Sequence, residues 1–198
     1  MNSSLKRLII ISMLTASAMV LSICESYIPI PIPGVKLGLA NVIILIMLYE
    51  FKIKEALLVD IMRILLVGIL RGTLLTPTFI FSLSGGMLSF VVMMLFSRIK
   101  LFSPIGVSAL GSIAHASGQI IAAIIILGTK EIIIYLPFIG ILSLVTGILS
   151  GVVTQIYLKR SVTGKFIETN KIWLKNEKIS ISRYFFHKND LLINFIIV

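Results

Sequence analysis

The stretch PTFIFSLSGGMLSFVVMMLF, residues 77–96, runs for twenty positions without a charged side chain. The hydrocarbon core of a bilayer is about 30 Å thick, so a helix that crosses it needs about 20 mostly apolar residues. Five further apolar stretches flank this one, at residues 5–24, 37–49, 53–70, 104–127 and 132–157. A chain of 198 residues cannot bury six helices that are apolar on every side. The sequence therefore predicts an all-α integral membrane protein, a six-transmembrane-helix bundle.

The composition agrees with a membrane environment. Hydrophobic residues make up 58% of the chain and charged residues 13%, against about 45–50% and about 25% in soluble domains. The net charge of +10 does not indicate nucleic-acid binding, because eight of the eighteen basic residues lie after the last apolar stretch. We expect one membrane domain, residues 1–158, and a basic tail, residues 159–198, that is poorly structured or rests on the anionic inner leaflet.

The basic residues also predict an orientation. They concentrate at the N-terminus, in the second and fourth connections and in the tail, whereas the alternate connections hold only Lys36, Arg71 and Lys130. Cytoplasmic loops carry the excess of Lys and Arg, so both termini are expected in the cytoplasm of a multi-pass cell-membrane protein. An N-terminal export signal is the alternative reading of residues 5–24, but bulky Ile23 precedes Cys24 where such sites carry a small residue.

The first outer connection contains Pro29, Pro31 and Pro33 at alternate positions. Alternating prolines cannot continue a helix and favour an extended segment. Such a stiff segment could cover the outer mouth of the bundle, or it could be a plain connector.

Asp60 and Arg63 lie near the middle of the third apolar stretch. Residues three apart on a helix are neighbours and can pair. A charge at the bilayer centre costs at least about 2.5–3.5 kcal/mol and persists where it faces protein or a watery cavity. The two residues are therefore either a structural ion pair or a site in which Arg63 holds a solute and Asp60 orients it.

The fifth stretch carries polar residues at helical spacing, namely Ser108, Ser112, His115 and Gln119. This spacing makes one polar stripe, which predicts either hydrogen bonds between helices or a cavity lining at His115 and Gln119. A metal site is not expected, because no second His or carboxylate stands at ligand spacing.

We place Asn41 about one turn into the second helix from its outer end. The polar residues of the helices then lie at mid-depth or in the outer half of the membrane. This asymmetry predicts a solute pocket that opens outward. The candidate substrate-binding residues are Lys36, Asn41, Asp60, Arg63, Arg71, His115 and Gln119. The cationic groups favour an anionic small-molecule solute, unless Asp60 neutralises Arg63.

Small residues predict close helix contacts. Gly147 and Gly151 form a GxxxG pair on the sixth helix. Ser12 and Ala16 form a similar pair on the first helix, which could pack inside the bundle or present a docking face to another membrane subunit.

Motifs for catalysis are missing from the sequence. It contains no GxxxxGK[ST] phosphate loop, no aspartate-rich pair of motifs for magnesium-diphosphate chemistry and no visible nucleophile set. We expect no enzyme activity, no catalytic residues, no metal and no cofactor.

Residues 25–41, with Glu25, the three prolines and the run PGVKLGLAN, resemble the Gx transporter family, whose members are often labelled heptaprenyl diphosphate synthase component I. Asp60-Ile-Met-Arg63, Arg71-Gly72 and the small-residue helix around His115 share the resemblance, which covers about residues 5–157. The basic tail departs from it.

That family is similar to the substrate-binding S components of energy-coupling factor transporters. The resemblance implies six helices, an outward-facing pocket capped by outer loops, and docking through Ser12 and Ala16 to a transmembrane coupling subunit driven by ATPase subunits. Ser12 departs mildly from the usual alanine.

Three functions stay open at this stage. The first is a solute-binding subunit of an ATP-driven micronutrient importer. The second is an accessory membrane component of heptaprenyl diphosphate synthesis, with Arg63 and Arg71 facing a diphosphate. The third is a self-sufficient channel or carrier in which Asp60 relays protons.

Overall fold

A computed structural model describes residues 3–28, 36, 38–99 and 101–169. These residues form helices and connections, without a strand among them. The helices are α1 (Ser3–Glu25), α2 (Asn41–Glu50), α3 (Ile53–Leu70), α4 (Pro77–Ser97), α5 (Pro104–Leu127), the 3₁₀ helix η1 (Lys130–Tyr135) and α6 (Leu136–Thr169). The expected proline cap, at residues 29–35, and the greater part of the basic tail, residues 170–198, lie outside the described residues.

The third and fifth helices have the bounds that the sequence predicts, and local chemistry explains the ends of α5. Pro104 occupies the first turn, where a missing N–H costs nothing. The Ser103 side chain accepts a hydrogen bond from the main-chain N–H of Gly106 at 3.2 Å. Gly128 then ends the helix at φ 68°, a left-handed conformation that favours glycine.

The second helix differs from its prediction. It begins at Asn41 and not at residue 37, so placing Asn41 one turn inside it was wrong. Gly38 has φ 88°, and the chain turns there before the helix starts. With 10 residues, α2 is about 15 Å long, half the thickness of a bilayer core.

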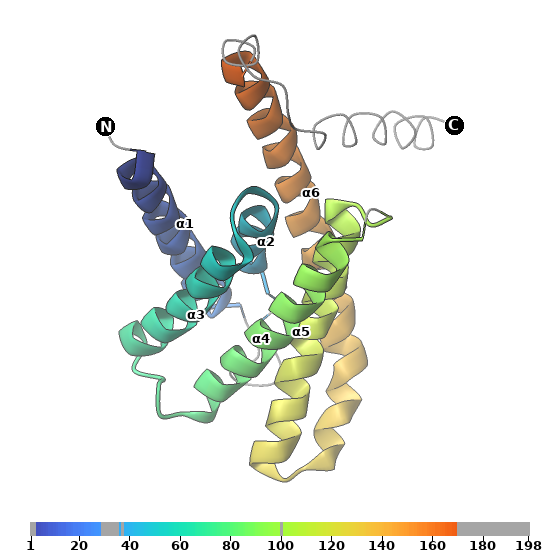
Figure 1. Cartoon of the computed structure of the whole chain (residues 1–198). Helices are drawn as coiled ribbons and strands as arrows, with labels where there is room; N and C mark the ends of the chain where they lie inside the picture. The colour runs from blue at the N-terminus through green and yellow to red at the C-terminus, as the bar shows by residue number, and fades with distance from the viewer. Residues whose placement is uncertain (1–2, 29–35, 37, 100, 170–198) are drawn as a thin grey trace. The chain divides into compact units, whose positions relative to one another are not determined.

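The short α2 is the centre of the helix packing. All residues from Asn41 to Leu48 are buried. The helix contacts α1, α3, α4 and α5, and Figure 1 shows it in the middle of them. This position explains why α2 is apolar all round: each side meets another helix, as expected for a buried element.

Four helical segments in the described part of the chain are long and apolar enough to cross a membrane: Arg7–Glu25, Pro77–Ser97, Pro104–Leu127 and Lys130–Ser161. Large apolar side chains lie exposed on them, for example Leu8, Met13, Ile125 and Ile141. Exposed apolar surface of this extent requires a lipid surrounding, which identifies a membrane protein. By contrast, α3 has 18 residues but carries four charged ones, Lys54, Glu55, Asp60 and Arg63.

Glycines allow α4 and α5 to approach each other closely. A Cβ on Gly118 would lie 2.8 Å from the carbonyl oxygen of Ser84 and 3.1 Å from Cα of Gly85. The Ser84 hydroxyl donates to the Gly118 carbonyl at 2.9 Å across the same interface. Gly85 and Gly118 thus bring the two backbones together at the depth of the polar residues described below.

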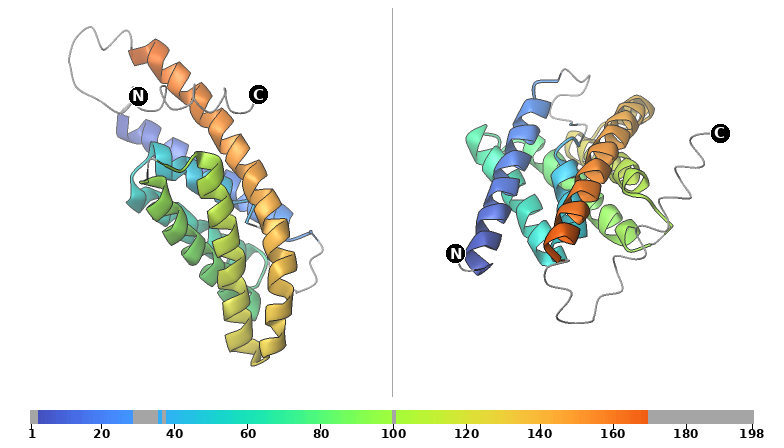
Figure 2. Two further views of the ribbon diagram at one scale, coloured as in Figure 1. Left: turned by 90° about the vertical axis from the view of Figure 1, so that its right-hand side faces the viewer. Right: turned by 90° about the horizontal axis from the view of Figure 1, so that it is seen from above.

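The predicted GxxxG contact of the last helix is confirmed. A Cβ on Gly147 would lie 2.7 Å from the Ser112 hydroxyl, and one on Gly151 would lie 2.5 Å from Cα of Ile105. These two glycines therefore press α6 against α5, and Figure 2 shows the two helices side by side.

The bounds of the last helix were predicted incorrectly at both ends. Residues 130–135 form η1, so α6 begins at Leu136, and it continues to Thr169 instead of stopping at residue 157. The chain divides at Leu158 into two units. All residues of the site described below lie before that boundary.

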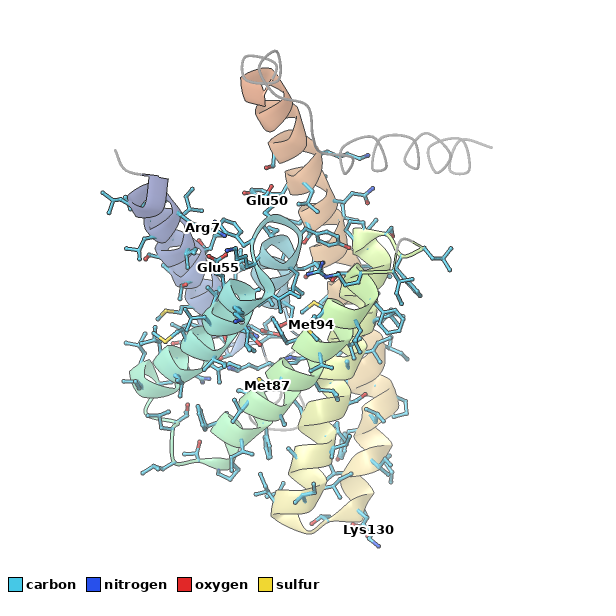
Figure 3. All side chains as sticks on the ribbon, in the orientation of Figure 1. Arg7, Glu50, Glu55, Met87, Met94 and Lys130 are labelled. Atoms are coloured by element: carbon cyan, nitrogen blue, oxygen red, sulfur yellow. The ribbon has the colours of Figure 1, made fainter. Side chains whose placement is uncertain are left out.

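Side-chain pairs also join the helices at the periphery. Arg7 of α1 contacts Glu55 of α3 at 2.7 Å, and Figure 3 labels both residues where the two helices meet. The Arg7 guanidinium also lies 5.9 Å from the centroid of the Phe51 ring. Both partners of the ion pair are partly exposed, in contrast to the charged residues of the interior.

Candidate functional site

A buried ion pair organises the middle of α3. The Arg63 guanidinium donates to Asp60 Oδ1 through Nε at 2.9 Å and through Nη2 at 2.7 Å. Asp60 is 1% exposed and Arg63 3%. Two charges so fully withdrawn from solvent are tolerated only because they neutralise each other in good geometry.

Asn41 connects this pair to two other helices. Its Oδ1 accepts from Arg63 Nη2 at 3.2 Å, and its Nδ2 donates to the Ser89 hydroxyl at 2.9 Å. The first residue of α2 thereby joins α3 and α4. Gly86 of α4 faces the same group: a Cβ there would lie 3.6 Å from Asp60 Oδ2 and 2.7 Å from Ile64 Cδ1.

A second hydrogen-bonded chain runs from the first connection into α5. The main-chain N–H of Lys36 donates to Gln119 Oε1 at 2.9 Å. Gln119 Nε2 lies 2.9 Å from His115 Nε2, one helical turn away. Gly85 makes room for this pair, because a Cβ there would lie 2.7 Å from Gln119 Cγ.

Glu25 holds the end of the first connection. Its carboxylate, on the last residue of α1, accepts from the main-chain N–H groups of Gly38 and Leu39. Sequence analysis named Glu25 in the stretch that carries the family resemblance but did not include it among the candidate binding residues. The available signal was an acid that closes an apolar helix just before a glycine-containing turn.

Lys36 lies in the same region with its side chain folded inward. Its Nζ is 3.5 Å from the Ser22 hydroxyl. Burial lowers the pKa of the Lys36 ammonium to about 8; the charge of Glu25 opposes this shift, and the charges of Arg63 and Arg71 add to it. Lys36 is therefore a cation that can lose its proton within an accessible pH range.

The two networks meet at Gly38. A Cβ on this residue would lie 2.9 Å from Asn41 Nδ2 and 3.6 Å from His115 Cγ. The structure thus gathers six of the seven candidate residues, namely Lys36, Asn41, Asp60, Arg63, His115 and Gln119. Arg71 is exposed at the end of α3, and no hydrogen bond among the described residues joins it to this cluster, although its charge acts on Lys36.

One polar atom of the cluster, Asp60 Oδ2, is buried without a partner among the described residues, as are the hydroxyls of Ser108, Ser112 and Ser143. The His115 ring interacts with the main chain of Gly85. An unpaired buried polar group costs about 1–3 kcal/mol unless a water, an ion or a solute meets it.

The candidate docking residues Ser12 and Ala16 are exposed on α1. They lie one turn apart on a helix that also exposes Leu8, Met13 and Val20. Within the described ranges, no group of three His, Cys, Asp or Glu side chains could hold a metal ion.

The fold and site together define a helical membrane protein with a buried polar cluster around the start of a short central helix. A family model described as heptaprenyl diphosphate synthase component I matches residues 14–157. The chain therefore belongs to this family, the Gx transporter family, as its sequence indicates. No curated protein and no solved structure matches the chain.

Proposed function

We propose that the chain is the solute-binding membrane subunit of an ATP-driven micronutrient importer, similar to an S component. The observation that carries this proposal is the buried cluster of Lys36, Asn41, Asp60, Arg63, His115 and Gln119, in which Asp60 Oδ2 has no partner among the described residues. Burying charged and polar side chains inside a membrane costs free energy, and where such side chains occur they are typical of a substrate site.

The length of α2 supports a site near the middle of the membrane. If residues 52–54, with their two lysines, lie at the cytoplasmic surface, then Asn41 lies about 15 Å above them, near the bilayer midplane. We therefore propose that the six helices form a multi-pass cell-membrane protein with both termini in the cytoplasm and the site open to the exterior.

Transport in this proposal requires partners. The exposed pair Ser12 and Ala16 on α1 docks the chain to a transmembrane coupling subunit, and ATPase subunits supply the energy. The chain itself catalyses no reaction.

The second candidate is an accessory membrane component of heptaprenyl diphosphate synthesis, which the description of the matching family favours. In that case the chain would anchor a soluble synthase or hold a prenyl diphosphate. The clustered acidic residues that bind magnesium in magnesium-diphosphate chemistry would then have to belong to the partner synthase.

Uptake into proteoliposomes separates the two candidates. The chain is reconstituted alone and together with a coupling subunit and ATPases from the same cell, and uptake from a defined vitamin mixture is followed by mass spectrometry. ATP-dependent uptake only in the complete assembly supports the importer. Active uptake by the chain alone, or prenyl synthase activity that copurifies with it, contradicts the importer.

A further inference from the structure

We infer that Glu25 is a positioning residue of the solute site: its carboxylate caps the start of α2 from helix α1 and thereby holds Asn41 in its bonds to the Arg63 guanidinium and the α4 helix. The inference rests on the proposed function, since it adds a residue to the site named there. Among the described residues, no hydrogen bond joins the Glu25 side chain to Asn41 or Arg63, so Glu25 acts through the main chain.

The start of α2 has no cap of its own. The first N–H groups of a helix have no partner within it, and a polar side chain at the N-cap commonly accepts from one of them. The N-cap of α2 is Ala40, and no side chain at this position accepts a hydrogen bond. Ala40 is 0% exposed and Asn41 1%, so water does not replace the missing acceptor. Another part of the chain has to supply it.

Glu25 is the residue that supplies this acceptor. One oxygen of its carboxylate, Oε1, accepts from the main-chain N–H of Gly38 and from that of Leu39, the second at 3.2 Å. Glu25 is itself 1% exposed, so these bonds are shielded from water. A negative charge at a helix N-terminus is also favoured by the helix dipole. The last residue of α1 therefore caps α2.

The turn that Glu25 holds leads directly to Asn41. The main-chain N–H of Asn41 donates to the Gly38 carbonyl at 3.0 Å. Gly38 is thus bonded to Glu25 through its N–H and to Asn41 through its carbonyl, in a conformation with φ 88° that favours glycine. A Cβ on Gly38 would lie 2.9 Å from Asn41 Nδ2, so the turn also packs against the Asn41 side chain.

Asn41 carries the constraint into the middle of the bundle. Its Oδ1 accepts from Arg63 Nη2 at 3.2 Å, and its Nδ2 donates to the Ser89 hydroxyl at 2.9 Å. Hydrogen bonds weaken steeply when their distance or angle changes. A looser turn at Gly38 would therefore weaken both bonds of Asn41 and remove one acceptor from the buried Arg63 guanidinium.

Two variants separate the reach of the Glu25 side chain from its charge. Glu25→Gln keeps the length and one carbonyl oxygen, which can accept from both N–H groups, but removes the charge. Glu25→Asp keeps the charge and shortens the side chain by one methylene. Glu55→Gln is the matched control, because it removes a partly exposed acid from α3, the helix that carries Arg63.

The side-chain amide of Asn41 reports its position directly. The full chain is labelled with ¹⁵N-asparagine in lipid nanodiscs, and Asn41→Gln identifies the Asn41 signal as the one that disappears. We expect hydrogen exchange at Asn41 Nδ2 to be about tenfold faster in Glu25→Asp than in Glu25→Gln, the effect of one lost hydrogen bond. Glu55→Gln should exchange like the wild type.

Two results of this measurement overturn the inference. The first is equal exchange at Asn41 in the wild type and Glu25→Asp. The second is faster exchange in Glu25→Gln than in Glu25→Asp, because the charge and not the reach of the side chain would then matter. Main-chain exchange in α5 shows whether each variant is folded. If Glu25→Asp does not fold, fast Asn41 exchange in a folded Glu25→Gln still overturns the inference.

The effect on solute binding is measured by native mass spectrometry after incubation with the defined vitamin mixture. We expect Glu25→Asp to retain about tenfold less than Glu25→Gln of the component that the wild type retains, and Glu55→Gln to retain as much as the wild type. Equal retention by all four proteins overturns the inference.

These results separate the inference from the proposed function. If Asn41 responds to the variants as expected but none of the proteins retains a component of the mixture, the proposed function fails. If the wild type retains a component and Asn41 is unchanged in Glu25→Asp, this inference alone fails.

Discussion

Arg63 and Asp60 form an ion pair of 2.7 Å in which both side chains are almost fully withdrawn from solvent. Arg7 and Glu55 form a pair of the same length at the periphery, with 45% and 24% of their side chains exposed. The same contact distance therefore occurs in two environments of one molecule, and the energetic consequences should differ, because a buried charge that loses its partner has no water to replace it.

Removing Arg63 should strongly destabilise the chain. Arg63→Met leaves the Asp60 carboxylate buried without its cation, which costs about 3–5 kcal/mol. Chemical unfolding in detergent measures the change, and Arg63→Met combined with Asp60→Asn should recover part of the loss. Arg7→Met, the matched control, should change stability little, and equal losses for the two variants would refute this account.

The contact between α4 and α5 should not tolerate a side chain at position 118. Gly118→Ala would place a methyl group 2.8 Å from the Ser84 carbonyl oxygen, a backbone atom that cannot swing away. We expect a stability loss of about 1–3 kcal/mol, as for other overpacked interiors. Gly140→Ala is the control, since a Cβ there meets nothing within 4 Å, and its thermal unfolding should match the wild type.

Glu25 should protect the end of the first connection. Glu25→Ala removes the acceptor of the Gly38 and Leu39 N–H groups. Hydrogen–deuterium exchange should then become faster at these two amides and stay unchanged in the middle of α5. Glu131→Ala, an exposed acid in η1, should leave exchange at both amides unaltered; if it accelerates them equally, Glu25 has no specific role.

Lys36 should make stability depend on pH in the alkaline range. Its pKa falls from 10.5 to about 8 in the folded chain, so the unfolded chain binds more protons between these two values. Folding stability should therefore rise with pH from about 8 to about 10.5. The stability of the wild type relative to Lys36→Met isolates this effect, and a difference that stays constant or falls over that range would contradict the shift.

The sequence predicts the helices well where local chemistry marks their ends. Pro77 and Pro104 begin α4 and α5 at the predicted residues, and Gly128 follows the predicted end of α5. The start of α2 was not predictable from apolar content, because residues 37–40 are as apolar as the helix itself. Gly38 has a positive φ, and its main-chain N–H donates to the Glu25 carboxylate, so the chain is not helical at this residue and α2 begins after it.

Most residues of the candidate site could be proposed from the sequence, but the hydrogen bonds between them could not. Charged and polar residues inside apolar stretches stand out by their cost, which identified Asp60, Arg63, His115 and Gln119. The same rule also selected Arg71, which lies exposed at a helix end, so its role in the site stays a prediction. The rule could not find Ser89, because serines are common in membrane helices. Partnerships such as that of Lys36 with Gln119 join residues 83 apart and depend on tertiary packing.

The most direct test of the central claim is native mass spectrometry of the purified chain in nanodiscs. We predict that the wild type carries one small molecule, that Asn41→Leu releases it, and that Arg98→Leu, at an exposed helix end, retains it. A wild-type chain that carries no molecule after purification from rich medium, or one that all three proteins carry equally, would contradict a solute site at this cluster.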